Sequence, residues 1–126
     1  MNKIKSYKDF LNENEKEIIV VESREQLRDI IKESPSDADL NHLDVSRVTD
    51  MYAMFWNSNF NGDISSWDVS GVTNMRYMFY KSSFNGDISN WKINKNCDIM
   101  NIFKDSSFTG ENTDFTNWDP DIINKL

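Results

Sequence analysis

An internal repeat constrains this chain more than any other feature of its sequence. Residues 43–66 read LDVSRVTDMYAMFWNSNFNGDISS and residues 67–90 read WDVSGVTNMRYMFYKSSFNGDISN, so two 24-residue copies follow one another without a gap. A third copy begins at Trp91, keeps the register as far as Gly110, and then needs a three-residue insertion before Asp114. A fixed period of this length is typical of repeat proteins, in which each copy buries its apolar side chains against the next.

Each copy shows the spacing of a short helix, followed by a turn and a strand. Apolar residues at i, i+3, i+6 and i+7 predict one buried helix face, as in Val72, Met75, Met78 and Phe79. Thr73 is the predicted N-cap of that helix. The Asn85-Gly86 pair predicts a turn with a positive φ, and residues 87–89 predict a strand in which only Ile88 is buried.

Stacking of the copies would place equivalent side chains above one another in columns. The predicted columns are Trp67/Trp91/Trp118, Met51/Met75/Ile99, Phe55/Phe79/Phe103 and Phe60/Phe84/Phe108. The predicted fold class is α/β: a short right-handed solenoid of the leucine-rich-repeat type, with about three 24-residue strand–helix coils and an N-terminal βα cap.

The segments that flank the repeats suggest four parts along the chain. They are an amphipathic N-terminal segment, an N-terminal βα cap, the repeat solenoid and a C-terminal tail or cap, at residues 1–14, 15–36, 37–119 and 120–126. Within the βα cap, residues 17–22 predict a strand and residues 24–33 predict a helix. Ser23 and Gln26 fit a capping box at the start of that helix.

Composition narrows the expected partners and sites. The chain has 21 acidic and 14 basic residues and a net charge of -7, so neither nucleic acid nor an anionic membrane is an expected partner. The single Cys and single His exclude an internal disulfide and a His-rich metal site. The sequence shows neither an apolar run long enough to cross a membrane nor a signal peptide, so we expect an intracellular location.

Polar positions of the predicted strands form the first candidate binding site, because the strand face of a repeat protein is commonly its recognition face. Exposed aromatic anchors after the buried Phe of each helix are the second. The candidate residues are Asp63, Ser65, Asp87, Ser89, Asp114 and Thr116 on the strands, with Trp56 and Tyr80 as anchors. The Asp column could share a Ca²⁺ ion or bond turn amides, and the second reading is favoured. We predict no metal and no cofactor.

Three further residue types admit a functional and a structural reading. Cys97 replaces Thr73 at the predicted helix cap, so it is either a reactive thiol or, as we favour, a degenerate cap. His42 takes the slot of Ser66 and is expected to be exposed. The Trp column could bind carbohydrate, but its periodicity favours the core. The chain shows no acid–base pair at a readable spacing, so we predict that it is not an enzyme.

The pattern W-D-V-S-x-V-T-x-M-x-x-M-F, followed by F-N-G-D-I-S, resembles the BspA-like leucine-rich-repeat proteins and the related 25-residue-repeat lipoproteins of mycoplasmas. The resemblance covers about residues 17–119 and implies adhesion or protein binding, with no catalytic residue. Residues 1–13, MNKIKSYKDFLNE, resemble the capsid-targeting peptides of T-even-like phages, which are cut after a triplet such as Leu11-Asn12-Glu13. A flexible or docked amphipathic helix is the alternative reading of this segment.

These observations lead to one main hypothesis about function. We predict a non-enzymatic protein-binding module that uses the polar strand face and whose partner is another protein. One alternative is a phage-encoded protein, either cargo of the phage particle or an acidic inhibitor of a host defence system. The other alternative is an adhesin-type repeat protein at a cell surface. The thin C-terminal cap also predicts that the chain can form a homodimer through one end of the solenoid.

Overall fold

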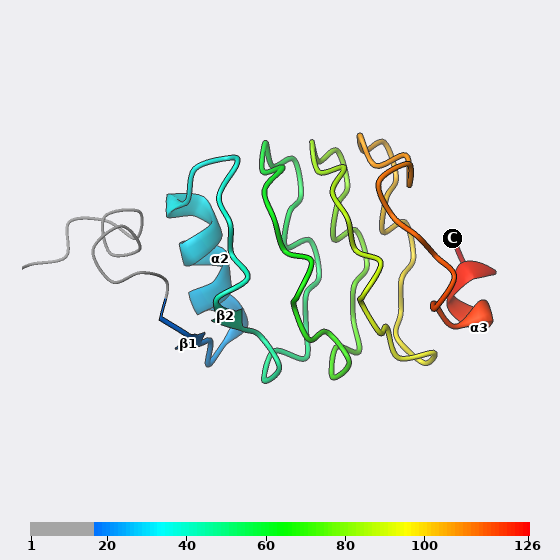
Figure 1. Ribbon diagram of the computed structural model, residues 1–126, viewed down its shortest axis with the longest axis horizontal. Helices are drawn as coiled ribbons and strands as arrows, with labels where there is room; N and C mark the ends of the chain where they lie inside the picture. The colour runs from blue at the N-terminus through cyan, green and yellow to red at the C-terminus, as the bar shows by residue number, and fades with distance from the viewer. Residues whose placement is uncertain (1–16) are drawn as a thin grey trace, which may run out of the picture.

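The computed structural model describes residues 17–126, which form a stack of irregular coils between two helices (Figure 1). The elements in chain order are β1 (Ile19–Val20), α2 (Arg24–Glu33), β2 (Leu43–Asp44) and α3 (Pro120–Ile123). Helix α2 lies at one end of the stack and α3 at the other (Figure 1). The predicted amphipathic segment 1–14, and with it the comparison to capsid-targeting peptides, lies outside the described residues.

Strands β1 and β2 pair in parallel with the period of the repeat. Ile19 lies opposite Leu43 and Val20 opposite Asp44, an offset of 24 residues. Residue Val21, just after β1, is fully buried and donates its amide to the Asp44 carbonyl at 2.9 Å. The segment around β1 therefore occupies the place of a coil that precedes residues 43–66.

Helix α2 has the predicted bounds, and Ser23 is its N-cap as predicted, although the second bond differs from that of a capping box. The Ser23 hydroxyl accepts the Gln26 amide at 3.1 Å, and the Gln26 side chain accepts the Glu22 amide at 2.7 Å. The first bond supplies a partner to a first-turn amide that the helix cannot satisfy internally, whereas the second bond goes to the amide of Glu22, before the cap. Leu27 and Ile31 face the core, and Ser34 ends the helix in extended backbone. This packing fixes α2 against the first coil.

The predicted fold class is wrong. Between Asp44 and Pro120 the structure shows neither helix nor strand, but turns, irregular backbone and isolated parallel bridges, Asp50–Asn74 and Asn74–Asp98. No solenoid of three strand–helix coils is therefore present in residues 17–126. We use the names first, second and third coil for residues 43–66, 67–90 and 91–118.

The hydrogen bonds explain why the segment predicted to be helical is not a helix. In the first coil every second amide donates across to the second coil, over 2.8–3.0 Å: Met51 to Asn74, Ala53 to Arg76, Phe55 to Met78 and Asn57 to Tyr80. Between them, the amides of Met54 and Trp56 close turns to the carbonyl three residues earlier, at 3.2 and 3.1 Å, and the amide of Tyr52 donates to the Asp50 carboxylate. An α-helix needs each amide for the carbonyl four residues back, so bonding to the neighbour excludes it. Thr73 accordingly caps no helix, and its hydroxyl donates to the Thr49 carbonyl.

This winding places two residues of each coil, four positions apart, in the left-handed region of φ. The residues concerned are Ala53, Asn57, Tyr77, Lys81, Asn101 and Asp105, with φ between 53° and 56°. Non-glycine residues adopt this conformation at a cost of about 1–2 kcal/mol each. The bonds between coils and the buried side chains offset that cost.

The apolar side chains face inward as predicted, and they meet their equivalents in the next coil. Trp67 and Trp91 stack with ring centroids 6.5 Å apart, and Phe55 and Phe79 do so at 5.2 Å. Met75 and the other residues of the predicted helix face are buried, although they lie on turns. The two predicted Phe columns and the Trp67–Trp91 pair are therefore confirmed, while the element that carries them differs.

Two glycines have a role that differs from the predicted one. Gly62 and Gly86 do not have positive φ values, so the predicted left-handed turn is wrong. A Cβ at Gly62 would lie 2.0 Å from the Ala38 carbonyl oxygen, and one at Gly86 would lie 2.8 Å from the Phe84 ring. Both positions require glycine because the backbone lies too close to a carbonyl oxygen, at Gly62, or to a ring, at Gly86, to leave room for a Cβ atom.

Candidate binding surface and groove

Four aromatic side chains cluster at the outside of the first two coils. They are Tyr52, Trp56, Tyr77 and Tyr80, which we call the aromatic surface. The rings of Trp56 and Tyr80 lie 4.7 Å apart at 59°, and those of Tyr77 and Tyr80 lie 5.5 Å apart at 86°. Trp56 is 45% exposed and Tyr52 is 39% exposed. Large aromatic residues that stay in solvent are the residue types enriched at binding hot spots.

The four rings differ in their positions within the repeat. Trp56 and Tyr80 occupy one repeat position, directly after the buried Phe55 and Phe79. Tyr77 stands at the left-handed position of the second coil, where its hydroxyl accepts a hydrogen bond of 3.2 Å from the Asn101 side chain. The prediction that Trp56 and Tyr80 are partly exposed is confirmed.

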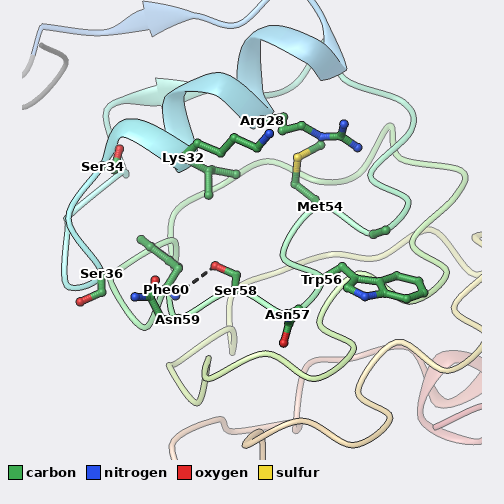
Figure 2. A pocket seen from close by; sticks show the side chains of 12 residues that line it. Arg28, Lys32, Ser34, Ser36, Met54, Trp56, Asn57, Ser58, Asn59 and Phe60 are labelled. Carbon is green, nitrogen blue, oxygen red and sulfur yellow. Dashed lines mark hydrogen bonds between the residues drawn. The ribbon is translucent and has the colours of Figure 1, made fainter.

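A groove lies between α2 and the first coil, directly beside Trp56 (Figure 2). Its volume is about 690 Å³. Arg28 and Lys32 of α2 line one wall, while Met54, Trp56 and Asn57 belong to the opposite wall. The rest of the lining is mixed: Ser34, Ser36, Ser58 and Asn59 are polar, whereas Ile31, Ala53 and Phe60 are apolar. We call this space the helix groove.

The only charged side chains that line the helix groove are two cations. Arg28 and Lys32 are four residues apart, so they lie on one face of α2. Within residues 17–126 neither side chain has an ion pair or a hydrogen bond, in contrast to Arg47, which binds Glu22 at 3.0 Å. In a chain with a net charge of -7, the groove is a local positive site.

Two backbone carbonyls of the first coil have no partner at this end of the stack. In the second coil, the Met78 and Tyr80 carbonyls accept amides of the first coil. The equivalent carbonyls of Met54 and Trp56 accept no hydrogen bond from any described residue, although both residues line the helix groove. Tyr52, by comparison, receives the Arg24 guanidinium. The groove thus lies where a preceding coil would supply donors.

The predicted Asp column forms turns. One carboxylate oxygen of Asp63 accepts both the amide and the hydroxyl of Ser65, at 3.0 and 2.7 Å. Asp87 bonds Ser89 in the same way, and Asp114 bonds Thr116. The favoured turn reading is therefore confirmed. The predicted strands are absent: Asp63 makes an isolated bridge to Asp39, and turns begin at Ser65, Ser89 and Thr116.

The same turn motif recurs at Asp44 and Asp68. The pKa values of Asp44, Asp68 and Asp114 are lowered, above all because hydrogen bonds from the following Ser or Thr stabilise the carboxylate. The structure does not bring the Asp turns together with Trp56 and Tyr80: no hydrogen bond or ring contact between described residues joins the two groups. The predicted site residues thus separate into two sets.

Cys97 and His42 both lie in the interior. Burial is the main reason that the pKa of the Cys97 thiol rises to about 11, with a further contribution from Asp98, so the thiolate needed for nucleophilic reaction is disfavoured. His42 is buried, so the prediction that it is exposed is wrong. The three repeat Trp side chains are buried as well, as the core reading predicted.

Within residues 17–126, no three His, Cys, Asp or Glu side chains gather as metal ligands would. The described helices are also too short or too polar to cross a bilayer.

At the α3 end, the amides of Ile99, Asn101, Phe103 and Asp105 donate to no described residue. A two-fold contact through this edge would set donors against donors, so a homodimer through this end would need side-chain contacts.

The 24-residue register, the stacked coils and the side-chain columns define the chain as a repeat protein. A family model described as "Mycoplasma protein of unknown function, DUF285" matches residues 25–125, and the chain belongs to this family. The part of the resemblance that pointed to mycoplasma proteins is confirmed, whereas the match carries no BspA-like or phage description. No curated protein and no solved structure matches the chain.

Sequence reasoning found two of the four rings of the aromatic surface and none of the helix groove. Tyr52 and Tyr77 stand at variable positions of the repeat, opposite Arg76 and Ala53, so periodicity gave no signal for them. The groove depends on the distance between α2 and the first coil, which no local pattern encodes. A basic pair at i and i+4 of the predicted helix, Arg28 and Lys32, is the signal that was present in the sequence.

Proposed function

We propose that the chain is a non-enzymatic protein-binding module, and that the aromatic surface is its contact site. The observation that carries this proposal is the exposure of Trp56 within a cluster of four aromatic rings on a stack whose other Trp side chains are buried. Exposed Trp and Tyr supply large contact areas at little cost in side-chain entropy. The resemblance to BspA-like proteins agrees with this class of function.

The polar turn residues, such as Asp63 and Asp87, are the weaker candidate within the same proposal. Each carboxylate already bonds its own turn, which leaves less capacity for a partner. The phage alternative rests on residues 1–13, which the structure does not describe, and on the net charge of -7, and no described contact favours it or the adhesin alternative. We therefore place the main contact on the aromatic surface.

Selection from a random peptide display library against the immobilised protein tests this proposal. The selected peptides are then measured against Trp56→Ala and Tyr80→Ala. We expect affinity to fall by at least about tenfold for Trp56→Ala, because a central aromatic anchor dominates an interface of this kind.

The matched control is Leu126→Ala, which removes another exposed large apolar side chain, outside the aromatic surface. It should leave the affinity unchanged. Thermal unfolding of each variant shows that the fold persists. If the selected peptides bind Trp56→Ala as tightly as the unsubstituted protein, the aromatic surface is not the contact site.

A further inference from the structure

We infer that the helix groove binds an acidic, extended peptide segment of a partner protein. The inference rests on the proposed protein-binding function and specifies the chemistry of the ligand. Three properties of the groove lead to it: its charge, its backbone acceptors and its position beside Trp56.

The charge of the groove selects an anionic ligand. Arg28 and Lys32 project from one face of α2 into the groove, and no described acid neutralises them (Figure 2). Asp29 and Glu33 lie on the same helix, but neither lines the groove. A carboxylate placed between the two cations would gain charge-assisted hydrogen bonds from both.

The backbone of the groove selects a peptide among anionic ligands. The carbonyls of Met54 and Trp56 accept no hydrogen bond from residues 17–126, whereas the same positions of the second coil accept amides two residues apart, those of Phe55 and Asn57. A peptide running along the first coil would supply such N–H groups, as strand addition does at a sheet edge. Phosphate groups of a nucleic acid have no N–H to offer, so they would leave these acceptors unpaired.

The position of the groove provides an apolar anchor point. Trp56 lines the groove and also belongs to the aromatic surface, so a peptide in the groove reaches the exposed rings directly. A ligand that combines Glu or Asp residues with one aromatic or aliphatic side chain would engage all three features. This combination of side chains is the specificity that we infer.

The test uses the full chain and a short Glu-rich synthetic peptide that carries one Phe. Binding is measured by calorimetry and by protection of Trp56 from an aqueous fluorescence quencher, since the other three Trp side chains are buried. We expect binding that weakens as salt rises and falls at least about tenfold when every Glu of the peptide is Gln. Methylation of alternate peptide amides should weaken binding several-fold further.

Charge reversal of the groove is the decisive variant. The double variant Arg28→Glu, Lys32→Glu should lose at least about tenfold in affinity for the Glu-rich peptide. The matched control, Lys92→Glu with Lys95→Glu, makes the same change in net charge on two exposed residues outside the groove and should bind normally. All four positions are exposed, so the variants should fold, which far-UV and near-UV spectra verify.

Several results would overturn the inference. Equal affinity for the Glu and Gln peptides would show that the groove does not recognise acidic residues. Unchanged binding by the Arg28→Glu, Lys32→Glu variant would show the same. An oligonucleotide that binds as tightly as the peptide at the same salt would show a site for anions in general. Should display-selected peptides depend on Trp56 but lack acidic residues, this inference would fail while the proposed function would stand.

Discussion

The indole Nε1 of Trp91 donates a hydrogen bond of 2.9 Å to the backbone carbonyl of Ile64, 27 residues earlier. Trp67 and Trp118 make the equivalent bonds to Leu40 and Ile88. Each of these indoles is buried, so the bond satisfies a donor and an acceptor that water cannot reach. The Trp column therefore joins consecutive coils by a directed bond as well as by packing.

Replacing Trp91 with Phe should show how much that hydrogen bond contributes to the free energy of unfolding. Phe keeps an aromatic ring but leaves the Ile64 carbonyl without its donor and creates a small void. We expect the free energy of unfolding to fall by about 2 kcal/mol in chemical denaturation. Trp56→Phe, at an exposed position, should change it by less than about 0.5 kcal/mol. Equal losses in the two variants would contradict a structural role for the indole bond.

Close backbone contact at Gly62 gives a second prediction. In Gly62→Ala the new Cβ would meet the Ala38 carbonyl oxygen at 2.0 Å, so the first coil must shift against the chain before it. We expect a loss of about 2 kcal/mol or more in unfolding free energy. Gly71→Ala is the control, because its Cβ would lie 3.4 Å from the Ser46 carbonyl oxygen. A Gly71→Ala variant as unstable as Gly62→Ala would refute this explanation.

The sequence predicts which side chains are buried better than it predicts the elements that carry them. The spacing of Met75, Met78 and Phe79 correctly identifies inward-facing residues, because any winding that brings them to one side satisfies the same pattern. It cannot distinguish a helix from successive turns, since that choice depends on carbonyls of the next coil. Helix α2 is predicted with correct bounds because its cap and its apolar face are local signals.

Other features depend on long-range geometry. The segment of β1 continues the 24-residue register, with Ile19 and Val21 in the slots of Leu43 and Val45. Two matching residues are too few to detect without the pairing. The aromatic surface and the helix groove likewise arise from contacts between coils, or between α2 and a coil. Only half of that surface, Trp56 and Tyr80, lies at a position that the repeat marks.

The left-handed residue Lys81 provides a test of backbone strain. Its φ is 54°, a conformation that glycine adopts freely and a β-branched residue adopts with difficulty. We expect Lys81→Gly to raise the free energy of unfolding by up to about 1 kcal/mol and Lys81→Val to lower it by about 1–2 kcal/mol. The two variants are compared by thermal and chemical unfolding. The opposite order would be inconsistent with a left-handed residue at this position.

The raised pKa of Cys97 predicts a loss of stability at alkaline pH. Folding raises the pKa of the thiol from 9.0 to about 11, chiefly because the thiolate is disfavoured in the interior. The unfolded chain therefore releases this proton first, and binds fewer protons than the folded chain between about pH 9 and pH 11. The contribution of Cys97 to stability is complete below pH 9 and is lost as the pH rises through this window.

The difference between the unsubstituted protein and Cys97→Ala isolates this effect from other groups that titrate at alkaline pH. The unfolding free energy of Cys97→Ala should decline less steeply between about pH 9 and pH 11. Alkylation at neutral pH should also be slow in the folded protein and fast after denaturation. Rapid alkylation of the folded chain would show that the thiol is accessible and ionised.

Amide hydrogen exchange, followed residue by residue with NMR, tests the stacking of the coils most directly. In the second coil the amides of Tyr77 and Phe79 donate to carbonyls of the third, whereas the equivalent amides of Asn101 and Phe103 have no described acceptor. We predict slow exchange for the first pair and fast exchange for the second. Equal protection of the two pairs, or no protection of Tyr77 and Phe79, would contradict the hydrogen bonding between coils. The inference that the helix groove binds a peptide depends on that bonding.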